Sequence, residues 1–412
     1  MRTRRGILIY CGDVLGLGHQ RRNTAIAARL LQEMPDTDAL LVSSLPAGAP
    51  ESTQGVDLIK LPSLRKAAGG GFEAGSLGMQ RSQVQRLRSG ILAGIANEFH
   101  PDLVLVDHKP TGVWNELRPS LQSWRASLDG PCLVFGVRDI VDSPATTVRR
   151  WRRQGVYQTI EQYYDAVLIY GSQEIFDTRS RYRLDRECSV PVDYCGYVCP
   201  AVAAPGNDTV RRDLGLGTGR IAVVTVGGGA DGYAVINVCL EALKHVDPEL
   251  GLRLVCVTGP FMSSEEVEAL RRVAATMPAC VVRFVDRLPA LLGTADVVVT
   301  MAGYNTLLEA TVARKPTIVL PRSGPSAEQS LRAERLARRG IVRTLHADER
   351  HPEVLAAAIT QCVVAPKPPA EMPGMDGLER TVHRLRELLE QREQRRTSRR
   401  RQSWRVVAGG RQ

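Results

Sequence analysis

Residues 221–232 read IAVVTVGGGADG, an apolar run that passes directly into a turn of glycines. Residues 7–18 repeat the pattern as ILIYCGDVLGLG near the start of the chain. A strand that leads into a glycine turn and then a helix is the opening unit of a Rossmann-like domain. The sequence therefore predicts two such domains, one opened by each stretch.

Short apolar runs alternate with helical patterns around both turns, as in repeated βα units built on parallel sheets. In the first half we expect strands at residues 6–10, 39–43, 57–60, 103–107, 132–137 and 166–170. In the second half we expect them at residues 220–226, 253–258, 281–285, 297–300 and 317–320. The predicted fold class is α/β, with two parallel sheets whose carboxyl ends face one another across a cleft.

The proline-containing segment 188–207 has little periodicity and predicts a linker between the two halves. We expect an N-terminal domain over residues 1–200, a C-terminal domain over residues 201–390 and a disordered basic tail over residues 391–412. Residues 62–80 hold five glycines and no apolar period, which predicts a long flexible loop.

The composition, 43% hydrophobic and 24% charged over 412 residues, is that of a globular protein. The sequence has no apolar run long enough for a membrane span or a signal peptide, so we expect a cytoplasmic protein. Its nine cysteines are scattered without metal-ligand spacing, and we expect no metal site.

Charge is concentrated at the C-terminus. The formal net charge is +10, and residues 392–412 alone carry eight arginines against one glutamate. Such a tail either makes peripheral contact with an anionic membrane, at its inner face, or only keeps the chain in solution. The rest of the chain has no basic stripe with interleaved aromatics, so we expect no specific nucleic-acid partner. On the helix expected at residues 326–340, Arg332 and three further arginines predict a solvated face.

His19 and Asp107 are the candidate catalytic residues of the first half. His19 follows Gly18 in the segment GLGHQRR, residues 16–22, where glycines let the backbone approach a ligand. A neutral imidazole there is suited to accept a hydroxyl proton. Asp107 ends the strand at residues 103–107 and could hold His19. On the residues alone, two alternatives stay open: His19 caps its own helix, and Asp107 caps the next turn.

The second half offers a binding site for a diphosphate. Gly228 and Gly229 join a strand to a helix, so backbone amides there could cradle phosphates without a lysine or a metal. Residues 301–310, MAGYNTLLEA, place Gly303 at a helix start, followed by the Thr306 hydroxyl. Glu309, one turn on, could accept two hydrogen bonds from a ribose. A plain glycine turn and a glutamate on a solvated helix face are the alternatives.

Four segments, in this order, resemble the MurG-like glycosyltransferases of the GT-B fold, which carry the family 28 C-terminal domain. They are GLGHQRR at 16–22, GGGADG at 227–232, AGYNTLLEA at 302–310 and VLPRSGPSAEQSLRAERLARRG at 319–340. The chain is more similar still to a bacterial group known only as predicted glycosyltransferases. The resemblance spans residues 6–363 and leaves out the last helix and the tail.

The resemblance implies transfer of a sugar from a nucleoside diphosphate sugar, with UDP as the expected nucleotide, to an acceptor hydroxyl. It implies no cofactor and no metal, because enzymes of this fold class hold the leaving diphosphate with amides and helix dipoles. The acceptor can be lipid-linked, a small molecule or a polysaccharide. The implied donor-binding residues, from diphosphate and ribose to nucleobase and sugar, are Gly228, Gly229, Gly303, Tyr304, Asn305, Thr306, Glu309, Arg287, Leu288, Glu328 and Gln329.

Other functions stay open. The opening G-x-G-H also resembles the nucleotide-sugar hydrolase of pseudaminic acid synthesis, in which water replaces the acceptor. A sugar-nucleotide 2-epimerase would need a richer set of carboxylates than the chain has. A non-catalytic GT-B-like binding protein would show a degraded donor site, whereas Gly303, Thr306 and Glu309 are all present. Glu328 stands where MurG has glutamine, which leaves the donor sugar open.

Overall fold

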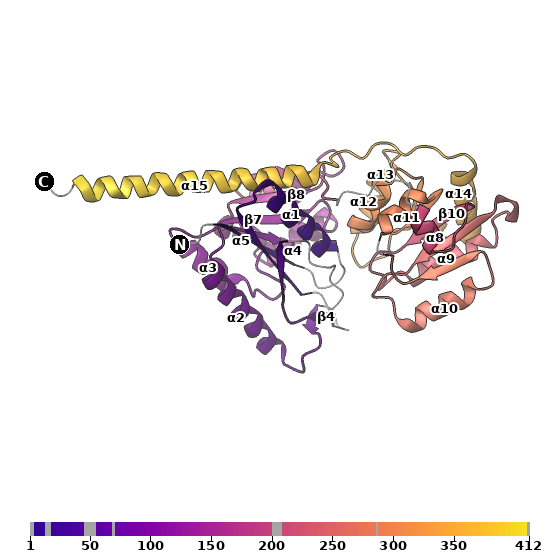
Figure 1. The fold of residues 1–412 in the computed structure, drawn as a ribbon, viewed down its shortest axis with the longest axis horizontal. Coiled ribbons are helices and arrows are strands. Elements are labelled where there is room, and N and C mark those ends of the chain that lie inside the picture. The colour runs from indigo at the N-terminus through magenta and orange to yellow at the C-terminus, as the bar shows by residue number, and fades with distance from the viewer. Residues whose placement is uncertain are drawn as a thin grey trace. The chain divides into compact units, whose positions relative to one another are not determined.

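The computed structural model describes residues 4–12, 18–44, 55–67, 71–199, 208–285 and 287–409. They form two compact units, each built on a sheet of parallel strands with helices around it (Figure 1). The first unit comprises Met1–Asp139, Pro144–Val198 and Gly374–Gln412, and the second comprises Ile140–Ser143 and Cys199–Pro373. The predicted α/β class with two parallel sheets is confirmed.

The sheet of the first unit has seven strands, and every neighbouring pair is parallel. In spatial order they are β3 (Val56–Lys60), β2 (Thr37–Ser43), β1 (Arg5–Cys11), β6 (Leu103–Asp107), β7 (Cys132–Arg138), β8 (Ala166–Tyr170) and β9 (Val192–Tyr194). The central strands are almost wholly apolar and buried, as expected for a parallel sheet covered on both faces. The strand order reverses between β1 and β6, which is where α/β sheets bind ligands.

Eight helices accompany this sheet in the part of the chain that the structure describes. They are α1 (Gly18–Glu33), α2 (Arg81–Phe99), α3 (Arg118–Ala126), α4 (Pro144–Arg153), α5 (Val156–Tyr163), α6 (Thr178–Arg181), α7 (Leu184–Glu187) and α15 (Gly377–Gly409).

The sheet of the second unit has six parallel strands. They run in the order β12 (Ala279–Val282), β11 (Leu252–Val257), β10 (Arg220–Thr225), β13 (Val297–Thr300), β14 (Thr317–Val319) and β15 (Arg343–Thr344). The helices are α8 (Asp208–Asp213), α9 (Tyr233–Leu243), α10 (Ser264–Ala274), α11 (Leu288–Thr294), α12 (Tyr304–Val312), α13 (Glu328–Ala337) and α14 (Pro352–Val364), with 3-10 turns at Pro248–Leu250 and Ala347–Glu349. Here the order reverses between β10 and β13.

The last helix belongs to the first unit, whereas the expected domain limits placed most of it in the C-terminal domain. We expected the C-terminal domain to extend to residue 390, but the chain returns to the first unit at Gly374. There α15 lies along α1 and β7 (Figure 1). Val382, Leu385 and Leu389 are buried at helical spacing, so this helix carries an apolar face that needs a partner. The helical period predicted the helix but could not say which unit it covers.

The arginine-rich segment, expected to be disordered, continues α15 as far as Gly409. Ion pairs tie the helix to the first unit: Arg384 Nε lies 2.8 Å from Asp193 Oδ2, and Arg5 Nε lies 2.8 Å from Glu393 Oε1. Among the residues described, no helix is both long enough and apolar enough to cross a membrane.

Residues 62–80, expected to be a flexible loop, contain a short antiparallel hairpin. It joins β4 (Leu64–Lys66) to β5 (Phe72–Ala74), and residues 68–70 between them lie outside the described chain. Leu64 is buried in a small apolar cluster with Val84 and Trp114. Strands of three residues are too short to show a period in the sequence, and the hairpin is held by packing against α2.

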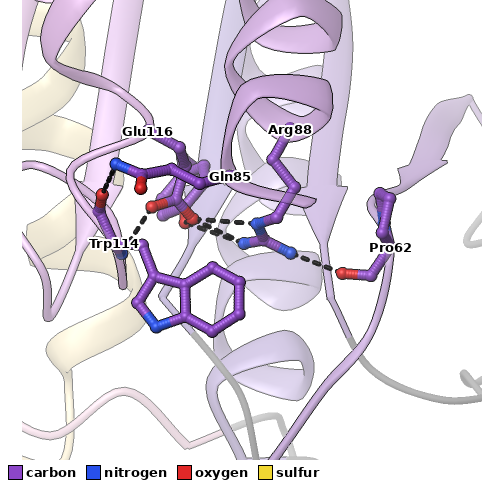
Figure 2. Close-up of polar contacts among 6 residues, drawn as sticks. Pro62, Gln85, Arg88, Trp114 and Glu116 are labelled. Atoms are coloured by element: carbon purple, nitrogen blue, oxygen red, sulfur yellow. Dashed lines mark hydrogen bonds and ion pairs between the residues drawn. The ribbon is translucent and has the colours of Figure 1, made fainter. Parts of the chain in front are cut away.

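A buried ion pair between Arg88 and Glu116 fixes α2 to the segments beside it (Figure 2). Arg88 Nη2 donates to Glu116 Oε1 at 2.6 Å, and both side chains are 0% exposed. The same guanidinium donates through Nη1 to the Pro62 carbonyl at 2.7 Å. Glu116 also accepts from the Tyr10 hydroxyl at 2.8 Å and from the Trp114 amide at 2.6 Å. The pair therefore joins β1, α2, the segment before the hairpin and the loop that follows β6.

Candidate active site

The first constellation lies where the strand order of the first sheet reverses. Asp107 is the last residue of β6, and His19 stands in the first turn of α1, the helix that follows β1. Gly18 begins this helix, whereas Gly16 lies outside the described residues. At Gly12 an added Cβ would come 2.2 Å from the Asp107 carbonyl oxygen, so only glycine lets the end of β1 pass this close to β6.

Three side chains of α1 converge on one carboxylate oxygen. His19 Nδ1 lies 2.8 Å from Asp107 Oδ2, Arg22 Nη2 donates to it at 2.6 Å, and Asn23 Nδ2 donates to it at 2.8 Å. His19, Arg22 and Asn23 are three and four residues apart, which places them on one face of the helix. The structure thus brings the two candidate catalytic residues together. The sequence analysis did not select Arg22 and Asn23, although their spacing from His19 indicates that they share its face of the helix.

Burial and neighbouring charges shift the pKa values of both Asp107 and His19. Burial alone would raise the pKa of Asp107, but the positive charge of Arg22 and the contact with His19 outweigh it and hold that pKa well below its usual value. Burial lowers the pKa of His19 below its usual 6.5, although Asp107 acts in the opposite direction. Asp107 Oδ2 and Arg22 Nη2 lie 2.8 and 2.9 Å from His19 Nδ1, so the role of this atom depends on the tautomer. In the tautomer with hydrogen on Nδ1, His19 donates to the ionised Asp107, which can only accept. Nε2 is then the atom that can take a proton.

A second imidazole lies beside the first. The ring centroids of His19 and His108 are 5.1 Å apart. His108 has a φ of 70°, and this left-handed conformation turns the chain sharply at the end of β6. Burial and the charges of Lys109 and Arg138 hold the pKa of His108 well below 6.5, so this ring is neutral at neutral pH. His19 therefore faces no extra positive charge from its neighbouring ring.

These pKa shifts predict acid sensitivity of the fold. Because the pKa of His19 is lower in the folded chain than the usual 6.5, the unfolded chain binds more protons below that pH, and stability falls as the pH drops. His108 acts with the same sign, and stabilisation from Asp107 is lost at still lower pH, below its usual value of 3.8. Each unit of pKa difference is worth about 1.4 kcal/mol.

The measurement is the free energy of unfolding in urea between pH 5 and pH 8. His19→Gln should flatten the rise of this free energy with pH. Identical slopes for wild type and His19→Gln would contradict the lowered pKa of His19.

The second constellation lies where the order of the second sheet reverses. The turn after β10 is pressed against the turn after β11: an added Cβ at Gly229 would lie 2.0 Å from the Thr258 carbonyl, and one at Gly259 would lie 2.2 Å from the Gly227 carbonyl. Gly229 and Gly259 have φ of 91° and 80°, so both positions also require glycine for their backbone conformation. The carbonyl of Gly228, just before Gly229, accepts a hydrogen bond from the Phe261 amide at 2.9 Å.

The start of α12 is next to this turn. Gly303 is the N-cap residue, and a Cβ placed on it would meet nothing within 4 Å. Thr306 Oγ1 lies 3.0 Å from the Cβ position of Gly227, which brings the glycine turn and the first turn of α12 together. Tyr304 is buried, whereas Asn305 and Thr306 are half-buried. The first amides of a helix have no intrahelical partner, so this end can bind an anion.

The remaining predicted donor residues stand on or beside α11, α12 and α13. Glu309 is 5% exposed in the second turn of α12. Gln329, at the start of α13, accepts from the Arg322 amide at 2.9 Å. Leu288, the first residue of α11, packs in the core, while Arg287 before it is exposed. The helix α11 packs against α12 and β10. Asp286, beside them, lies outside the described residues.

Arg332 was expected on a solvated face of α13, but it is 2% exposed. Its Nη1 donates to the Ala302 carbonyl at 2.8 Å and to Glu328 Oε1 at 3.1 Å, and its guanidinium lies 5.6 Å from the centre of the Tyr304 ring. Arg332 therefore fixes the backbone just before α12 to the start of α13. Sequence periodicity could not show this, because the partners are a carbonyl and a ring of another helix.

Comparisons with known proteins find similarity to glycosyltransferases. Residues 223–388 match the model of the glycosyltransferase family 28 C-terminal domain. An uncharacterized glycosyltransferase of Methanopyrus kandleri is 30% identical over 179 residues, which are 43% of this chain and 48% of that protein. A UDP-N-acetylglucosamine--N-acetylmuramyl-(pentapeptide) pyrophosphoryl-undecaprenol N-acetylglucosamine transferase of Pseudomonas fluorescens is 33% identical over 168 residues, 38% of this chain and 46% of that protein. The chain spans about half the length of the curated relatives it matches.

Solved structures extend the likeness to nearly the whole chain. MurG of Acinetobacter baumannii has a TM-score of 0.56 at 15% identity, and the match covers 93% of this chain and 99% of MurG. The glycosyltransferase of kitacinnamycin has a TM-score of 0.58 at 16% identity, covering 95% and 96%. Such low identity shows the fold alone. The chain therefore has the GT-B fold, and its residues 223–388 match the glycosyltransferase family 28 C-terminal domain.

Proposed function

We propose that this protein is a glycosyltransferase that moves a sugar from a nucleoside diphosphate sugar, with UDP as the nucleotide, to an acceptor hydroxyl. The observation that carries the proposal is the open start of α12 beside the glycine turn after β10, with Thr306 3.0 Å from the Gly227 Cβ position. Backbone amides and the helix dipole favour a diphosphate there without a metal ion. Glu309 supplies the carboxylate for the ribose hydroxyls.

In the proposed reaction His19 is the general base. The acceptor oxygen loses its proton to His19 Nε2 and forms a bond to the anomeric carbon of the sugar. The bond between that carbon and the diphosphate oxygen breaks, and its electron pair leaves with the diphosphate, whose charge the amides at the start of α12 stabilise. Asp107, 2.8 Å from His19 Nδ1, orients the ring and stabilises the imidazolium.

For the partners we propose a nucleotide-sugar donor and a lipid-linked acceptor. The lipid-linked acceptor is inferred from two relatives whose names give a pyrophosphoryl-undecaprenol as their acceptor. Peripheral contact of the arginine-rich end of α15 with an anionic membrane stays a prediction, as do a cytoplasmic location and independence from metals and cofactors.

Gly303→Ala should weaken binding of the donor nucleotide while the fold is kept. The new methyl group meets nothing within 4 Å and φ is −66°, so the loss of stability should stay below about 1 kcal/mol, the usual difference between glycine and alanine at an N-cap. The methyl would stand where the diphosphate approaches the amides. Loss of one charge-assisted hydrogen bond should then weaken UDP binding about tenfold or more.

Calorimetric titration with UDP and thermal unfolding of the same sample measure both quantities. Gly78→Ala is the matched control, because it adds a methyl group to equally open space in the first unit. Unchanged UDP affinity in a folded Gly303→Ala variant would rule out the diphosphate site at α12.

A nucleotide-sugar hydrolase remains the second candidate, because the His19–Asp107 pair could deprotonate water as well as an alcohol. Mass analysis of products from each candidate donor, with and without acceptors, separates the two. A glycosylated acceptor supports transfer, whereas free sugar at an equal rate in both mixtures supports hydrolysis.

A further inference from the structure

A buried arginine stands beside the two candidate catalytic residues, and the proposed reaction does not use it. Arg22 is in the second turn of α1, three residues after His19, and its side chain is 0% exposed. Its Nη2 donates to Asp107 Oδ2 at 2.6 Å, and its guanidinium carbon lies 4.8 Å from the centre of the Tyr170 ring at the end of β8. The face of an aromatic ring holds a cation without neutralising it. Arg22 therefore brings a fixed positive charge to the site.

The guanidinium of Arg22 is also next to the proposed base. Arg22 Nη2 lies 2.9 Å from His19 Nδ1, and Asp107 Oδ2 lies 2.8 Å from the same atom. Asn23 donates to this carboxylate oxygen but carries no charge. A carboxylate at such a distance attracts a protonated imidazole, and a guanidinium repels it. Because the two charges are opposite and stand at similar distances, their effects on the protonation of His19 largely cancel.

The other groups that face His19 do not replace the charge of Arg22. In the part of the chain that the structure describes, Asp107 is the one carboxylate within ion-pair distance of His19. The ring of His108, 5.1 Å away between centroids, is neutral at neutral pH. Arg138, at the end of β7, repels a protonated His19 more weakly than Arg22 does. Without Arg22 the attraction by Asp107 would be opposed mainly by burial.

This balance of charges matters because a general base has to be neutral when the acceptor arrives. If the attraction by Asp107 were unopposed, the buried carboxylate would draw a proton onto the ring and hold it as an ion pair. Nε2 would then carry a hydrogen and could not take one from the acceptor. The charge of Arg22 makes His19 a weaker base, but it leaves Nε2 free at the start of the reaction.

We propose that Arg22 is a positioning residue whose charge opposes that of Asp107, so that His19 stays neutral and able to take a proton at neutral pH. The link to sugar transfer rests on the proposed function, whereas the effect of Arg22 on the protonation of His19 does not.

Nitrogen NMR of the full chain, labelled with 15N-histidine, measures the protonation of His19 directly. The chain has seven histidines, and the signal that is absent from His19→Gln identifies the required one. In Arg22→Met the pKa of His19 should rise by about one to three units, the usual effect of a nearby charge. Arg22→Lys should reverse part of that rise, because it keeps the positive charge. Arg29→Met is the control, since it removes a half-buried arginine from the same helix and should leave the pKa of His19 unchanged.

The pH dependence of turnover gives a second measurement. Turnover of the wild type should fall on the acid side as His19 becomes protonated, and in Arg22→Met this fall should begin at higher pH. Below the pKa of His19 in both proteins, each unit of rise should lower turnover about tenfold, because the neutral fraction falls by that factor. Above both values turnover should approach that of wild type. A residue that only supports the fold would lower turnover equally at every pH.

A second pair of variants keeps the test decisive if Arg22→Met does not fold, since a buried carboxylate without its arginine is destabilising. In Asp107→Asn the repulsion by Arg22 has no opposing charge, whereas Arg22→Met/Asp107→Asn has lost both charges. The pKa of His19 should therefore be lower in Asp107→Asn than in the double variant, by about one unit or more. Equal pKa values in these two proteins would overturn the proposal.

The outcomes separate this proposal from the proposed function. An unchanged pKa of His19 in Arg22→Met, in a protein that transfers sugar, would overturn the role of Arg22 alone. Turnover that falls equally at every pH would also overturn it, because Arg22 would then only support the fold. A pKa that rises as expected, in a protein that transfers no sugar, would support the effect of Arg22 on His19 and contradict the proposed function.

Discussion

His19→Ala should lower the rate of sugar transfer by about two to four orders of magnitude, the usual contribution of a general base. In the structure His19 Nδ1 is held 2.8 Å from the Asp107 carboxylate, which leaves Nε2 to take the acceptor proton. Donor affinity should stay near that of wild type, because the diphosphate is assigned to the amides of the second unit. The expected loss is therefore in turnover and not in donor binding.

Initial rates, UDP affinity and unfolding temperature should be measured on one preparation. His245→Ala is the matched control, since that histidine is 44% exposed in the second unit and its rate should equal that of wild type. If His19 only caps α1, the variant would keep its turnover and lose about 0.5 to 2 kcal/mol of stability. That result would remove His19 from the catalytic residues.

Glu116→Ala should cost about 3 to 5 kcal/mol of stability, the usual effect of breaking a buried ion pair. The guanidinium of Arg88 would remain 0% exposed with only the Pro62 carbonyl and the Tyr10 hydroxyl near it. The Trp114 amide would also lose its acceptor. Because the Arg88–Glu116 pair joins β1, α2, the segment before the hairpin and the loop after β6, unfolding should remain cooperative while its midpoint falls.

Two control variants test whether the loss of stability comes from leaving a buried charge without its partner. Arg88→Met/Glu116→Leu should recover much of the loss, because no unpaired charge remains in the interior. Glu73→Ala removes a partner from an exposed pair in the nearby hairpin, Arg65–Glu73 at 2.9 Å, and should cost at most about 1 kcal/mol. A loss for Glu116→Ala as small as that for Glu73→Ala in urea unfolding would contradict the buried pair.

The sheets could be predicted because their strands are continuous apolar runs. The strands expected at residues 103–107, 166–170 and 297–300 coincide with β6, β8 and β13. The missed strands β4, β5, β9 and β15 have two or three residues each, which is too few for a period. The place of α15 was missed for a different reason: a helical repeat shows that a face is apolar but not which sheet or helix covers it.

Some residues of the sites could likewise be selected from the sequence, and others could not. His19, Asp107 and Gly303 could be selected because each stands at a strand end or a helix start, where parallel sheets collect ligands. Arg332 and Arg88 could not be selected from the sequence. A buried arginine is evident only from the carbonyls, carboxylates and rings that surround it in the structure.

Calorimetric titration of UDP into the full-length protein, in buffer with excess chelator, tests the central claim most directly. We expect saturable binding at one site per chain that Gly303→Ala weakens and His19→Ala leaves unchanged. A wild-type protein that binds neither UDP nor any other nucleoside diphosphate, or that binds one only after a divalent ion is restored, would contradict it.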